Sequence, residues 1–86
     1  MIITRQTAAA KIAAYLHHEI TLAELVEWAE DAVMEGEFPP HEIDTLRTVT
    51  ARLGVADVRA FGLAWEDCEQ LLEQLGYAVR VDVVAA

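Results

Sequence analysis

The clearest hydrophobic pattern in the chain lies between Ile20 and Gly36 and predicts an amphipathic helix. Apolar residues recur there at the i, i+3, i+4, i+7 spacing that places them on one helix face. They are Leu22, Leu25, Val26, Ala29, Ala32 and Val33. Thr21 and Glu24 have the spacing of a capping box, in which each side chain accepts a hydrogen bond from the other residue's backbone N–H. Gly36 is expected to end the helix in a left-handed conformation.

Three further segments have helical periodicity. The first should begin after Thr4 or Thr7 and run to about residue 18, and the others should cover residues 40–53 and 64–75. The last of these has an apolar stripe that we expect to face the core. Its members are Trp65, Cys68, Leu71, Leu72 and Leu75.

Residues 55–61 are expected to form a short helical turn, with Val58 and Phe61 facing inward. The period then changes, because apolar and polar residues alternate over residues 77–84, which predicts a C-terminal β-strand. A single strand leaves its hydrogen-bonding edges open. It could pair with Ile2 and Ile3 or with the same strand of a second chain. The segment that contains Ile2 and Ile3 is either a strand or a simple lead-in to the first helix.

Length and composition restrict the architecture. With 86 residues, the chain is expected to form a single domain over residues 1–86. The fold class is mainly α: a compact bundle of four main helices plus a short helical turn and a C-terminal β-strand. No apolar run approaches the ~20 residues of a membrane span, and the N-terminus lacks the features of a signal peptide. We therefore expect a cytoplasmic, bacterial-type protein that does not enter a membrane.

Charge adds a second feature to the helix that follows Thr21. The net charge is −9, which disfavours binding to nucleic acid and to anionic membranes. Glu24, Glu27, Asp31 and Glu35 are spaced so that they form a line along the outer face of this helix, which we call the acidic line. Like charges at this spacing destabilise a helix.

Two interpretations of the acidic line remain open. It is either a solvated face that keeps the protein soluble or a docking surface for a basic protein partner. Residues 19–37 contain seven acids and no Lys or Arg, so nothing local offsets the repulsion. Trp28, on the flank of the line, fits either the edge of the core or an interface anchor.

A calcium site is the nearest metal motif. Asp31, Gly36 and Glu42 match positions 1, 6 and 12 of an EF-hand loop. Val33 at position 3 has no oxygen to offer, so the ligand set fails. We therefore expect no calcium binding.

Catalysis, metals and cofactors are equally unsupported by the remaining residues. His17 and His18 are adjacent, so on a regular helix they point in different directions. Cys68 lies on an apolar stripe, where a buried and unreactive thiol is expected. The chain has no phosphate-binding loop and no nucleophile elbow, and its last helix is too acidic to recognise DNA. We expect a protein that is not an enzyme and holds no metal or cofactor.

The segment Lys11–Val33, KIAAYLHHEITLAELVEWAEDAV, resembles the opening helical hairpin of small bacterial colicin-type immunity proteins. The shared features are an apolar helix, a short Ile-Thr link and an acidic helix that contains a Trp. In that family an acidic bundle neutralises a basic toxin nuclease, partly as a mimic of nucleic acid.

The resemblance implies a non-enzymatic protein-binding module, with an immunity-like inhibitor of a basic partner as its most concrete form. The residues expected to bind the partner are Glu24, Glu27, Trp28, Asp31 and Glu35. The alternative is a structural homodimer assembled through residues 77–84.

Overall fold

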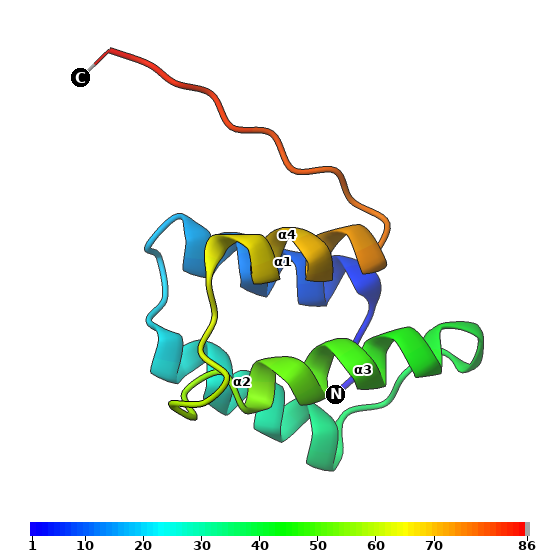
Figure 1. Cartoon of the computed structure of the whole chain (residues 1–86). Helices are drawn as coiled ribbons and strands as arrows, with labels where there is room; N and C mark the ends of the chain where they lie inside the picture. Colours follow the sequence, from blue (N-terminus) through cyan, green and yellow to red (C-terminus); the bar gives the residue numbers. More distant parts are fainter. Residues whose placement is uncertain (86) are drawn as a thin grey trace.

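A computed structural model describes residues 1–85 and contains four α-helices and one short 3-10 helix. The elements are α1 (Arg5–Leu16), α2 (Leu22–Glu35), η1 (Pro40–Glu42), α3 (Ile43–Gly54) and α4 (Trp65–Gln74). In Figure 1, α1 and α4 form one layer and α2 and α3 form the other. The prediction of a mainly helical bundle is confirmed, and each expected main helix is present.

The helix starts follow from local side-chain chemistry. The Glu24 N–H donates to the Thr21 hydroxyl at 3.1 Å, and the Thr21 N–H donates to the Glu24 carboxylate at 3.0 Å, so the predicted capping box is confirmed. Thr4 caps α1 by accepting from the Thr7 N–H at 3.1 Å. At the start of α4 the Ala64 N–H donates to the Asp67 carboxylate at 2.8 Å.

The end of α2 differs from the prediction. Gly36 has φ −75° and ψ 147°, so its backbone is extended and not left-handed. A β-carbon at this position would collide with the backbone oxygen of Ala32 and lie 2.8 Å from Cγ1 of Ile3. Glycine is therefore required here because a β-carbon would have no room between the Ala32 carbonyl, one turn earlier in α2, and the Ile3 side chain, and not because of the handedness of its backbone.

The N-terminal segment is a buried lead-in to α1. The Ile3 N–H donates to the Glu37 carbonyl at 2.8 Å, and the Glu37 N–H donates to the Met1 carbonyl at 2.7 Å. These bonds make an isolated parallel bridge between Ile2 and Glu37. The Ile3 side chain is fully buried. The segment thus pairs with the chain that follows α2, and the alternative of pairing with the C-terminal tail is wrong.

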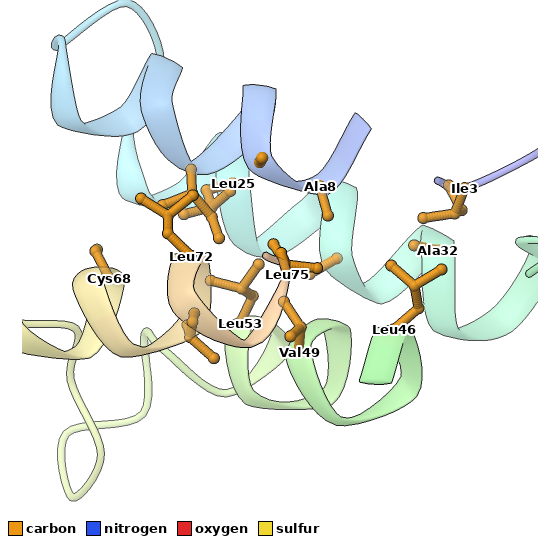
Figure 2. Close-up of a cluster of buried hydrophobic side chains, with 14 residues drawn as sticks. Ile3, Ala8, Leu25, Ala32, Leu46, Val49, Leu53, Cys68, Leu72 and Leu75 are labelled. Carbon is orange, nitrogen blue, oxygen red and sulfur yellow. The ribbon is translucent and has the colours of Figure 1, made fainter. Parts of the chain in front are cut away.

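The core lies between the helices and contains mainly Leu, Ile, Val and Ala side chains, as Figure 2 shows. All four α-helices and the N-terminal segment contribute to it. Its members are Ile3, Ala8, Ala9, Ile12, Leu25, Ala29, Ala32, Leu46, Val49, Leu53, Cys68, Leu71, Leu72 and Leu75. Thr50 is also fully buried, and its hydroxyl donates to the Leu46 carbonyl at 2.7 Å, which satisfies the buried polar group.

Four side chains predicted to face the core are exposed instead: Val33, Val58, Phe61 and Trp65. Val33 lies at the edge of the apolar stripe of α2, where it lines a surface depression between α2 and α3. Val58 and Phe61 belong to a series of turns, not a helix, in the connection that crosses from the α2–α3 layer to α4 (Figure 1). Within residues 55–64, only Ala56 is buried.

The predicted C-terminal strand is not present in the single chain. Residues 77–85 are extended and leave the helical body, as Figure 1 shows, and no strand is assigned within them. Tyr77 is held by a hydrogen bond from its N–H to the Leu72 carbonyl at 2.9 Å, and Val79 packs against the core. We call residues 77–85 the tail.

Candidate functional site

The acidic line lies on the exposed side of α2, with all four carboxylates in contact with solvent. The other three acids of residues 19–37 are exposed as well: Glu19, Glu30 and Glu37. Within residues 1–85, no salt bridge involves any of these seven. The arginines that do pair are used elsewhere, in Arg5–Glu42 at 2.8 Å and Arg52–Asp67 at 3.4 Å.

The members of the acidic line are not equivalent. Glu24 completes the capping box, so it stabilises α2 directly. In the described chain the carboxylates of Glu27, Asp31 and Glu35 accept no hydrogen bond and form no ion pair. These three residues are therefore the part of the line for which the fold itself supplies no role.

Trp28 is half-buried and packs against the core cluster. It lies between the apolar stripe and the acidic line, as its place in the sequence indicated. Trp28 therefore contacts the core while part of its surface remains accessible, and helical spacing places it next to Glu24 and Asp31 on α2.

An apolar cleft borders the acidic side of α2, and sequence reasoning missed it. Val33 is 52% exposed and Met34 is 82% exposed. With Glu30, Ala51, Gly54 and Val55, they line a shallow depression of about 370 Å³ between α2 and α3, which we call the α2–α3 cleft. The available signal was Met34 itself, because an i+3 spacing from Asp31 places it among the acids and away from the core.

A second groove, of about 440 Å³, lies between α1, α4 and the start of the tail. Ala9, Ala13 and Leu16 contribute from α1, and Trp65 and Leu72 contribute from α4. Residues 77–80 form its remaining wall. Trp65 lines this groove, which we call the tail groove, and is exposed there although it lies on an apolar stripe.

Cys68 is fully buried. Burial raises the pKa of its thiol above the usual range, and the neighbouring Asp67 carboxylate raises it further. A thiol that resists ionisation and is closed to solvent is a poor nucleophile.

We expect alkylation of Cys68 by iodoacetamide at pH 8 to be at least about tenfold slower in the folded protein than in denaturant, because only an unfolded chain presents a thiolate. The rate is measured by mass spectrometry over time in buffer and in concentrated urea. Equal rates in the two solvents would mean that Cys68 is accessible in the native fold.

Residues that matched a calcium loop have other roles. Glu42 forms a salt bridge with Arg5, and Gly36 lies in close contact with Ala32 and Ile3. Residues 1–85 contain no group of three or more His, Cys, Asp or Glu side chains arranged to hold a metal ion. No helix in this part of the chain is both long enough and apolar enough to span a bilayer.

Comparison with known proteins adds no relative to this description. No family model, no curated protein and no solved structure matches the chain.

Proposed function

We propose that the chain is a non-enzymatic protein-binding module and that the acidic line is its docking surface for a basic partner. The observation that carries this proposal is the absence, within residues 1–85, of any ion pair to the seven exposed acids of residues 19–37. Such a surface raises the rate of encounter with a positively charged protein and favours that protein over acidic competitors.

The α2–α3 cleft supports the same surface. Protein interfaces combine an apolar centre with a polar rim, and Met is enriched in them. Met34 and Val33 provide apolar area beside Glu30 in this cleft, and helical spacing places Asp31 next to Met34 on α2. The partner we expect therefore has Lys or Arg side chains around an apolar side chain that enters the cleft. An immunity-like inhibitor that covers a basic toxin is the most concrete form of this function.

The test uses a variant with Glu27→Lys and Asp31→Lys. Both residues are exposed and neither caps the helix, and the substitutions relieve repulsion with Glu24 and Glu35, so we expect the fold to be unaltered or slightly more stable. The immobilised wild-type chain should retain a basic protein from cells that produce it, and raised salt should release that protein. The variant should bind the same protein at least roughly tenfold more weakly.

The matched control carries Asp57→Lys and Glu73→Lys. These acids are also exposed, and the control has the same net charge as the test variant, but neither lies on α2. It should bind the partner like the wild type. Equal binding by the wild type and the Glu27→Lys, Asp31→Lys variant would remove the acidic line from the interface. Inhibition of the captured protein at 1:1 stoichiometry would support the immunity-like form, whereas undiminished activity would exclude it.

The second candidate function is a structural homodimer assembled through residues 77–84. The observation that favours it is the tail, whose described residues are extended while Val81, Val83 and Val84 are exposed. An apolar, extended segment with open backbone groups tends to add to another strand.

A further inference from the structure

We propose that two copies of the chain pair through an antiparallel ribbon of their tails, in a register centred on Val81, with the end of each tail lying over the tail groove of the other copy. The inference rests on the second candidate function, which it makes specific, and is independent of the acidic line. It follows from three observations: the open backbone of the tail, the order of its side chains and the position of the tail groove.

The backbone of the tail has no partner in the single chain. After the bond from the Tyr77 N–H to Leu72, no backbone hydrogen bond joins residues 78–85 to the rest of the described protein. Val83 is 94% exposed, and Val81 and Val84 are also exposed. Pairing with another strand would satisfy the backbone groups and cover the valines at the same time.

The side chains of the tail are complementary to themselves when one copy runs antiparallel to the other. With Val81 opposite Val81, Arg80 lies opposite the partner's Asp82 and Val79 lies opposite the partner's Val83. The symmetry repeats both contacts, so the ribbon has two Arg–Asp pairs on one face and only apolar or aromatic residues on the other. Opposite charges and β-branched pairs at these positions stabilise antiparallel strands.

Other registers lose this match. If the centre of the antiparallel pairing moves by one residue, Arg80 lies opposite Arg80 or Asp82 lies opposite Asp82. In a parallel pair without offset, both of these like-charge contacts occur. Like charges directly opposite each other are destabilising. If the centre of the pairing lies between Val81 and one of its neighbours, Val81 lies opposite Arg80 or Asp82, which are charged. The register centred on Val81 is therefore the one in which opposite charges face each other and apolar side chains face each other.

The tail groove lies where the partner's tail would end. Val79 faces the body of its own chain, because it is half-buried against the core. Directly opposed residues in an antiparallel pair point to the same face, so the partner's Val83 also faces this body. The groove bounded by residues 77–80, Ala13 and Trp65 would receive it. A paired segment of nine residues is about 30 Å long, so the two helical bodies lie at opposite ends of the ribbon.

The test exchanges the charges of the tail. Sedimentation from roughly 1 to 200 µM, a range suited to a small interface, should show the wild-type chain as a monomer–dimer equilibrium. Arg80→Asp and Asp82→Arg, made singly, should each weaken the dimer roughly 10- to 100-fold, because every cross-strand pair becomes a like-charge pair. The double variant should restore the wild-type constant to within about threefold. Arg59→Asp, an exposed charge change outside the tail, should leave it unchanged.

A cysteine scan gives a second measure of register. Val81→Cys should form a covalent dimer on mild oxidation, because this position lies opposite itself and antiparallel pairs meet the distance that a disulfide needs. Val83→Cys alone should not, but it should crosslink to Val79→Cys in a mixture. The buried Cys68 does not compete.

The outcomes test the proposed register separately from the existence of the dimer. A dimer that is not restored by the double charge exchange, or that crosslinks through Val83→Cys alone, overturns the register and leaves the homodimer in place. A chain that stays monomeric at roughly 200 µM overturns both. Neither result bears on the acidic line, whose own variants are tested by binding to a basic protein.

Discussion

Replacing Ile3 with alanine is expected to lower the free energy of unfolding by about 2–5 kcal/mol, a large fraction of the roughly 5–15 kcal/mol that stabilises a domain. The side chain is fully buried although it precedes the first helix. Figure 2 shows it at the end of the core where Ala32 and Leu46 lie. Truncation would remove buried methyl and methylene groups next to Gly36 and leave a cavity there.

The measurement is urea unfolding of the wild type, Ile3→Ala and a matched control, Ile2→Ala. Ile2 is adjacent but 66% exposed, so its truncation should change stability by about 0.5 kcal/mol or less. The backbone bonds to Glu37 remain possible in both variants, so the comparison isolates the buried side chain. Similar stability losses in the two variants would contradict the burial of Ile3.

Gly36→Ala is expected to destabilise the fold by about 1–3 kcal/mol, even though the backbone angles of Gly36 suit any residue. The added β-carbon would meet the Ala32 backbone oxygen and the Ile3 side chain, and neither is the free end of a flexible group. The N-terminal segment or the end of α2 must therefore move. We expect the variant to weaken the bonds between Ile3 and Glu37 and so to loosen residues 1–4.

Gly54→Ala is the matched control. This glycine ends α3, and an added β-carbon would lie 3.8 Å from Cγ of Glu30, an ordinary contact. Alanine is the better helix former, so the control should be neutral or stabilising by up to about 1 kcal/mol. The two substitutions thus have opposite expected signs in the same urea experiment. A neutral Gly36→Ala variant would show that the close approach is not needed.

Local chemistry made α2 predictable. Thr21 and Glu24 satisfy the first backbone groups of the helix through their own spacing, and no distant residue is involved. The apolar period placed Leu25, Ala29 and Ala32 in the core because a helix turns by a constant angle per residue. The exposure of Glu27 and Asp31 followed from the same geometry.

The features that the hydrophobic pattern did not predict depend on how segments distant in the sequence pack together. The left-handed residue near α2 is His18, in the link before the helix, and not Gly36, which is extended and lies close to the Ile3 side chain. Thr50 occupies a core position although it is polar, and the bond from its hydroxyl to the Leu46 carbonyl, within α3, satisfies the buried group there. Val33 is exposed where it lines the α2–α3 cleft.

The sequence by itself determined the main helices, most of the core face of α2, and the exposed acidic line, because caps and helical period act within a few residues. The tertiary structure alone decided that Ile3 is a core residue, that Met34 borders a cleft, and that the tail pairs with no strand within residues 1–85. These depend on which surfaces meet across the fold. An alternating sequence such as residues 77–84 specifies a preference for pairing, but only the tertiary structure decides whether a neighbouring strand is within reach.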